Sequence, residues 1–190
     1  MNTINTYQSD FTESNYRNLL RLASASYRFL QFHEIHEAED NRPVILWRHD
    51  LDFSVHRSLA LATIEAEEGV KATYLIHLHS QFYHWGEKVI ADKIREIMSL
   101  GHEIGLHFDP LYYGARVQNN DDLHKWLSWE KNILETELEK EIKVFSWHNP
   151  DVGGDWLNLD DDYMAGMVNA YGKALREKFT YCSDSNGYWR

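Results

Sequence analysis

The chain has 190 residues, and 43% of them are hydrophobic, which is enough for one domain with a sizeable core. Its formal net charge is −11 at pH 7, and its Lys and Arg residues are scattered, so a surface that neutralises phosphates is not expected and nucleic acid is excluded as a partner. Cys182 is the single cysteine, which excludes an intramolecular disulfide framework and a Cys-rich zinc site and favours a reducing compartment.

The N-terminus carries no recognisable targeting segment. The stretch MNTINTYQSDFTES has neither the basic start nor the apolar run of a secretory signal, and no later apolar run is long enough to span a bilayer. We therefore expect a cytoplasmic protein without a transmembrane segment.

The first predicted element is a helix over residues 13–31, within an N-terminal extension of residues 1 to about 42. After it, short apolar runs alternate with longer amphipathic ones, and there is no internal repeat. We expect a single domain over residues 1–190, with a βα core from about 43 to 190.

Five short runs rich in β-branched and aromatic residues predict strands. They cover residues 44–50, 72–78, 103–109, 143–149 and 179–184. Helices are expected between them, over residues 55–68, up to about 100, 121–140 and 161–177. Ser54 is a suitable N-cap for the first, and Gly69 and Gly101 supply stops. Strands alternating with helices indicate an α/β fold with a parallel sheet, either doubly wound or closed as a barrel, although five units fall short of the eight of a regular barrel.

Every predicted strand ends in His or Asp. The ends read HDLD, HLHS, HFD, WHNP and SDS, and they carry His49, Asp50, Asp52, His77, His79, His107, Asp109, His148 and Asp184. Any one of these residues alone is more often solvated or structural. Because ligands bind at the carboxyl ends of parallel strands, their coincidence at one rim predicts a site.

Imidazoles and carboxylates without thiolates suit zinc or another divalent first-row metal. Such an ion lowers the pKa of a bound water toward about 7 and polarises a carbonyl, which is the chemistry of hydrolysis. In a D-x-D pair, one acid can bind the metal while the other takes a proton from the attacking water. Strand alternation places His107 and Asp109 on one face and His102 on the other, where His102 is expected to satisfy a buried hydrogen bond.

Five segments together resemble a known family. RHDLDFS, GVKATYLIHLHSQFY, LGHEIGLHFD, FSWHNP and YCSDSNGYW are similar to the polysaccharide deacetylases of the NodB-homology type, carbohydrate esterase family 4, and especially to the branch with H-D-x-D and G-H-E-I-G-x-H-F-D at lipopolysaccharide or capsule loci. The resemblance covers roughly residues 43–190. It implies a distorted, incomplete (β/α) barrel with parallel strands, a divalent metal, usually zinc, and removal of an N-acetyl group from an amino sugar of a surface polysaccharide or its precursor.

The resemblance also implies roles for three residues. Asp50 matches the general base, Asp52 the metal-binding acid, and His107 the first histidine of the family's H-x-x-x-H ligand pair. A water deprotonated by Asp50 would attack the acetyl carbonyl, and a histidine would protonate the amine. The expected partner is thus an N-acetylated sugar or glycan.

The remaining motifs depart from the family pattern. The second ligand histidine is replaced by Leu111, so a third ligand is expected from His148 or Asp109, with His148 ahead. His148 stands in a segment resembling the family's R-x-P motif, in place of the arginine that orients the base, and can be a ligand, an orienter of the base or an acid. Asp184 and Trp189 match the segment whose Asp and Trp line the acetyl pocket.

Two alternatives to a deacetylase are considered. A non-catalytic relative that binds glycan or protein is favoured by the missing second histidine and by the absence of the family's final L-x-H motif before Arg190. A chain truncated at Arg190, or a different residue as the acid, would account for the missing motif equally well. The retained Asp50 and Asp52 count against it, since buried unpaired acids cost stability. A D-x-D glycosyltransferase is less favoured, because the segment before residue 44 is too short and helical for a nucleotide-binding unit.

Overall fold

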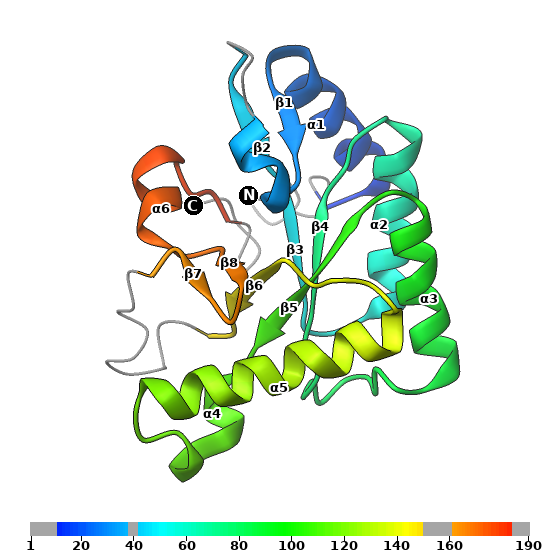
Figure 1. The fold of residues 1–190 in the computed structure, drawn as a ribbon. Helices are drawn as coiled ribbons and strands as arrows, with labels where there is room; N and C mark the ends of the chain where they lie inside the picture. The colour runs from blue at the N-terminus through cyan, green and yellow to red at the C-terminus, as the bar shows by residue number, and fades with distance from the viewer. Residues whose placement is uncertain (1–10, 38–41, 150–160, 184–190) are drawn as a thin grey trace, which may run out of the picture.

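The computed structural model describes residues 11–37, 42–149 and 161–183. Its centre is a six-stranded sheet in the order β3-β4-β5-β6-β8-β7, drawn in Figure 1. The strands are β3 (Arg48–Leu51), β4 (Thr73–Ile76), β5 (Glu103–Phe108), β6 (Val144–Trp147), β7 (Tyr163–Met164) and β8 (Met167–Asn169). All neighbours pair in parallel except β7 and β8. This confirms an α/β fold with a parallel sheet, while the described residues form an open sheet and not a closed barrel.

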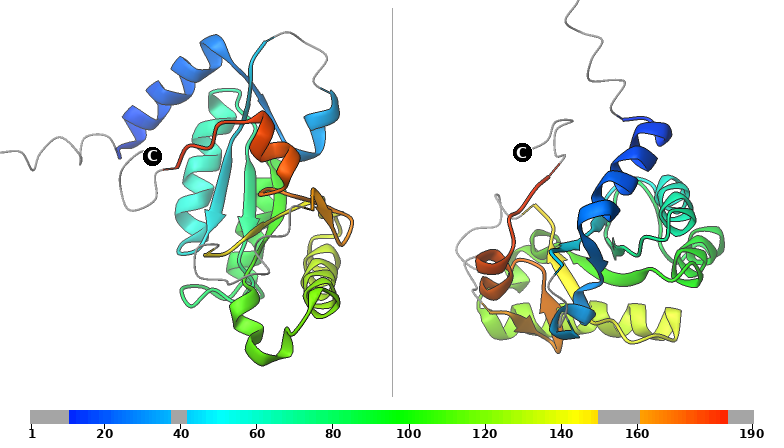
Figure 2. Two further views of the ribbon diagram at one scale, coloured as in Figure 1. Left: turned by 90° about the vertical axis from the view of Figure 1, so that its left-hand side faces the viewer. Right: turned by 90° about the horizontal axis from the view of Figure 1, so that it is seen from above.

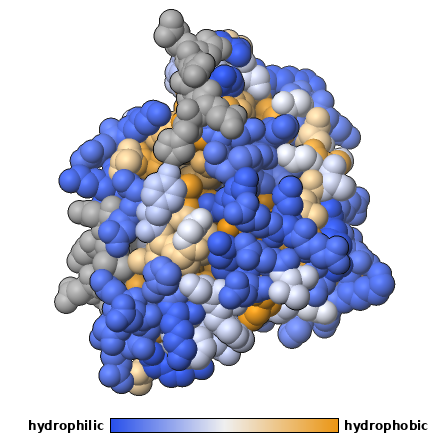
Figure 3. All heavy atoms as spheres, in the orientation of Figure 1, coloured by the Kyte–Doolittle hydropathy of each residue, from blue (hydrophilic) through white to orange (hydrophobic). Residues whose placement is uncertain are grey.

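A separate two-stranded parallel sheet joins β1 (Arg28–Leu30) and β2 (Val44–Leu46). Helices and helical turns surround the two sheets, as Figures 1 and 2 show. They are α1 (Glu13–Ser26), η1 (Phe32–Glu37), α2 (Val55–Glu67), α3 (Lys88–Ser99), α4 (Pro110–Tyr113), η2 (Gly114–Arg116), α5 (Asn120–Leu138) and α6 (Lys173–Lys178). Within the described residues, no helix is long and apolar enough to cross a membrane. The face seen in Figure 3 is mostly hydrophilic, with hydrophobic residues in patches between hydrophilic ones.

Alternation along the strands gives the large sheet two different faces. Tyr74 and Ile76 belong to the main hydrophobic core, which also contains buried apolar side chains from each of α2, α3 and α5. Leu75, with Val144 two strands away, belongs to a second, smaller core that contains residues of η1 and α6. The sheet is therefore covered on both sides, as a parallel sheet requires.

Three predicted helices are confirmed. The hydroxyl of Ser54 accepts a hydrogen bond from the backbone N–H of Arg57 at 3.3 Å and so caps α2 as expected. The α3 helix buries Ile90, Ile94 and Ile97 on one face. The α5 helix buries four leucines against the sheet and begins close to the predicted residue.

The predicted N-terminal helix is too long. It ends at Ser26, and the following segment forms β1, which pairs with β2 from Arg28↔Val44 onward. The predicted strand over residues 44–50 is correspondingly broken at Trp47, so that β2 and β3 belong to different sheets. Local propensity misses both events because they depend on pairing between distant segments.

The prediction of a helix over residues 161–177 is wrong. This segment forms the hairpin β7–β8, whose two turn residues, Ala165 and Gly166, have φ values of 52° and 73°. Two consecutive positive φ angles are what a tight hairpin turn requires and a helix cannot use. Only Lys173–Lys178 is helical, as α6. The strand predicted over residues 179–184 is also wrong for residues 179–183, because β8 occupies the position beside β6.

Candidate metal centre

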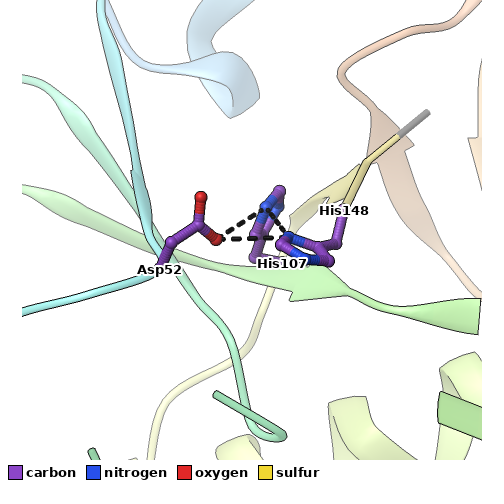
Figure 4. A group of neighbouring side chains, drawn as sticks. All are labelled: Asp52, His107 and His148. Carbon is purple, nitrogen blue, oxygen red and sulfur yellow. Dashed lines mark hydrogen bonds and ion pairs between the residues drawn. The ribbon is translucent and has the colours of Figure 1, made fainter. Parts of the chain in front are cut away.

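Three side chains converge at the carboxyl end of the sheet. Oδ1 of Asp52 lies 3.3 Å from Nε2 of His107 and 3.2 Å from Nδ1 of His148, and the two imidazole nitrogens are 3.1 Å apart. Figure 4 shows the carboxylate and both rings directed toward one point. The three donors come from the ends of β3, β5 and β6, so residues up to 96 positions apart (148 minus 52) are brought together by the sheet.

The sheet register explains why these residues meet. Asp50 pairs with Leu75, Leu75 with Gly105, and His107 with Ser146, so these positions share the sheet face that carries the smaller core. Continuing the alternation by two residues from Asp50 and from Ser146 leads to Asp52 and His148. The site therefore lies at the end of the face that η1 and α6 cover.

The second nitrogen of each imidazole is already engaged. Nδ1 of His107 is 2.6 Å from the hydroxyl of Ser146, and Nε2 of His148 is 2.8 Å from the side-chain amide of Asn149. Asn149 adopts a φ of 47°, which asparagine tolerates better than most residues. Outer partners of this kind fix ring orientation in metal sites. Nε2 of His107 and Nδ1 of His148 are left to face Asp52.

The donor spacing fits a tetrahedral ion. Bonds of about 2.0 Å around tetrahedral zinc separate neighbouring donor atoms by about 3.3 Å, close to the 3.1–3.3 Å between the three atoms. Oδ1 of Asp52 is moreover a buried atom without a hydrogen-bond partner among the described residues. Such an atom is costly unless a cation or water satisfies it. The residues present therefore fit a divalent metal.

A second group shares His148 with the first. His77, Asp109 and His148 also offer donors that lie within 4.8 Å of one another. Its spacing is looser, with 3.9 Å between Nε2 of His77 and Oδ2 of Asp109, and the other carboxylate oxygen of Asp109 accepts the N–H of Leu111 at 2.9 Å to cap α4. The shorter distances between donor atoms therefore favour the triad of Asp52, His107 and His148 as the metal-binding group.

The carboxylate of Asp52 also favours a cation, because its pKa is lowered. Burial opposes ionisation of Asp52, but contacts with His107 and His148 lower its pKa below the ordinary value. Contact with Asp52 raises the pKa of His148 against the effect of burial. Burial lowers the pKa of His77 to about 3, helped by His148 and His107. His77 is thus a neutral imidazole at pH 7, and its buried Nε2 has no hydrogen-bond partner among the described residues.

Asp50 lies beside the triad but contacts a different residue. Its carboxylate is 3.5 Å from Nη2 of Arg48, which also donates to the hydroxyl of Tyr171 at 2.7 Å. Burial opposes the charge of Arg48, yet Asp50 raises its pKa above the ordinary value. Asp50, Asp52 and His148 line one large cavity. Among the described residues, Asp50 forms an ion pair with Arg48, and its charge also contributes to the raised pKa of His148.

His49 and His102 face away from the site. His49, on the other side of β3, contacts the buried carboxylate of Glu65 on α2 at 2.6 Å. His102 accepts a hydrogen bond from the N–H of Ala72 at 3.1 Å and donates to the carbonyl of Ala62 at 2.9 Å. The expectation of a buried structural hydrogen bond for His102 is confirmed.

Sequence reasoning named most of the residues that meet here, but not all. Asp184 and Trp189, the expected acetyl-pocket residues, lie outside the described residues. The sequence places His77 at a strand end without predicting a role for it, and it does not predict Arg48 and Ser146 as site residues. Each of these three lies two positions before another polar strand-end residue, so period-two alternation was the available signal.

Comparison with known proteins supports the fold. No protein-family model matches the sequence, and no curated protein matches it. Among solved structures, the chain is similar to the Streptococcus pyogenes deacetylase PplD in complex with acetate, with a TM-score of 0.54 and 14% sequence identity, over 98% of this chain and 84% of that one. The chain therefore has the fold of a deacetylase, with histidine and aspartate side chains that could bind a metal gathered at the carboxyl end of its parallel sheet.

Proposed function

We propose that the chain is a metal-dependent hydrolase that removes an N-acetyl group from an amino sugar of a surface polysaccharide or its precursor. The observation that carries this proposal is the triad of Asp52, His107 and His148, whose donor atoms are spaced for a tetrahedral ion. The structural likeness to a deacetylase in complex with acetate supports the same reaction class. We further propose that the open sheet is the incomplete (β/α) barrel of the NodB-homology type.

In this proposal the three triad residues hold the metal, which is zinc. When bound, the ion would supply a water of lowered pKa and polarise the acetyl carbonyl. His148 serves as the third ligand in place of the family's second histidine, whose position is the exposed Leu111. Asp109 serves as the N-cap of α4 and as an outer neighbour of the site.

Asp50 is the proposed general base. It is separated from Asp52 by one residue, and a backbone hydrogen bond of 3.0 Å from the N–H of Asp52 to the carbonyl of Asp50 fixes the turn between them. The guanidinium of Arg48 pairs with its carboxylate and orients it at the wall of the cavity. Arg48 thus acts as a positioning residue.

Metal analysis combined with an activity assay tests this proposal. Purified wild type should hold close to one equivalent of zinc by inductively coupled plasma mass spectrometry, and Asp52→Ala and His107→Ala should lose it. His56→Ala is the matched control, because His56 is an exposed histidine of α2 that belongs to neither group of candidate metal ligands and does not line the cavity. Asp50→Asn should keep the metal but lose acetate release from N-acetylglucosamine oligosaccharides.

The outcomes separate the parts of the proposal. A wild type that stays metal-free after zinc addition would refute the metal centre. If the triad bound zinc but the protein released no acetate, the chain would be a binding domain with a deacetylase fold. Loss of zinc in Asp50→Asn would mean that Asp50 is a ligand and not the base.

A further inference from the structure

Two phenylalanines at the rim of the candidate site are exposed and in contact with each other. Phe53 is 65% exposed and Phe82 is 64% exposed, and their ring centroids lie 4.6 Å apart with the planes inclined by 48°. A single exposed apolar side chain needs no explanation, but two paired aromatic rings form a defined apolar surface. We call Phe53 and Phe82 the aromatic pair.

A polar contact fixes the geometry of the aromatic pair. The hydroxyl of Ser80 donates to the carbonyl of Asp52 at 2.7 Å and accepts from the N–H of Phe82 at 3.1 Å. One side chain thereby ties the loop after β3 to the loop after β4, and each loop carries one of the two rings. The rings are positioned before any ligand arrives, which lowers the entropic cost of binding.

The aromatic pair is continuous with the candidate metal centre. Phe53 directly follows Asp52, whose carboxylate points at His107 and His148 in Figure 4. Phe53 and Phe82 line the same cavity as Asp52 and His148. An apolar wall with a few converging polar groups is the usual composition of a small-molecule site.

We propose that the aromatic pair is a sugar subsite that stacks against the apolar C–H face of the ring next to the N-acetylated one. This rests on the proposed function and narrows its substrate class to an oligosaccharide or polysaccharide, since the pair would hold a second sugar ring beside the one at the triad. Neither ring offers a hydrogen-bonding atom, so the pair recognises the ring face and not its hydroxyl pattern.

Binding measurements test the subsite without relying on turnover. Calorimetric titration of the zinc-supplemented Asp50→Asn protein would compare chitotetraose with N-acetylglucosamine, with and without the double substitution Phe53→Ala and Phe82→Ala. The double substitution should weaken chitotetraose binding about tenfold and leave N-acetylglucosamine binding unchanged. Leu22→Ala, which removes a 72% exposed apolar side chain of α1 outside the cavity, should change neither.

The subsite would be refuted if the protein with the aromatic pair and the protein without it bound chitotetraose equally well. It would also be refuted if the double substitution weakened the binding of both sugars equally, or if the protein that keeps the pair bound neither sugar. If the double substitution weakened the binding of octyl glucoside but not of chitotetraose, the pair would be a site for an alkyl chain, and the sugar subsite would also be refuted. Acetate release by the wild type is measured separately. If the wild type released no acetate but chitotetraose binding depended on the aromatic pair, the deacetylase function would be refuted and the subsite would stand.

Discussion

Replacing Glu65 by alanine is expected to destabilise the protein severely. The carboxylate of Glu65 is fully buried and accepts hydrogen bonds from the hydroxyls of Tyr16 and Tyr74, the latter at 2.6 Å, and it contacts Nε2 of His49 at 2.6 Å. Its partners lie on α1, β4 and β3, so one side chain of α2 joins three other elements. The contact also lies next to the site, because His49 immediately precedes Asp50.

The size of the effect follows from burial. Removing one partner of a buried charged network leaves the others unpaired, which costs about 3–5 kcal/mol. A domain is stable by only about 5–15 kcal/mol, so the loss is a large share of the total. Urea denaturation followed by far-UV circular dichroism would measure the free energy of unfolding.

Glu68→Ala is the matched control. Glu68 ends the same helix and also joins it to α1, through ion pairs with Arg17 and Arg21, whose side chains are 31% and 63% exposed. Exposed pairs contribute little, so this variant should unfold close to the wild type. If Glu65→Ala and Glu68→Ala unfold at the same urea concentration, the buried network does not carry the stability assigned to it.

The same network sets a pH dependence. Burial opposes ionisation of Glu65, but His49 and the two tyrosines lower its pKa below the ordinary 4.5. A carboxyl with a lowered folded-state pKa adds stability above its unfolded pKa and loses it as the pH falls through the folded value. The stability gap between wild type and Glu65→Ala should therefore be full at pH 7 and shrink below about pH 4.5.

Two further predictions concern the face of the sheet that carries the site. Ser146→Ala removes the partner of His107 Nδ1 and should weaken zinc binding about 10–100-fold in a competition titration; unchanged affinity would mean that the serine does not orient the ring. Gly105→Ala would place a Cβ 2.7 Å from Val144 Cγ1 and 2.8 Å from its carbonyl oxygen, and such overpacking should lower the free energy of unfolding by about 1–3 kcal/mol. If the Gly105→Ala variant unfolded at the same urea concentration as the wild type, the strand would be able to shift and accommodate the added Cβ.

Several features of the fold follow from local sequence. The spacing of Ile90, Ile94 and Ile97 predicts α3, and Ser54 predicts the start of α2, because amphipathic period and capping are encoded within a few residues. The strand-end residue His107 could likewise be assigned to the site, since parallel strands present their carboxyl ends at one edge.

Other features required the tertiary structure. Three features depend on contacts between residues far apart in the chain. They are the place of β8 beside β6, the break at Trp47 between the strands β2 and β3, and the contact of His49 with Glu65. The sequence alone determined which side chains could supply a metal site and on which strand ends they lie. Only the tertiary structure decided that Asp52, His107 and His148 share one point, because a 3 Å spacing is set by strand register and packing and not by local propensity.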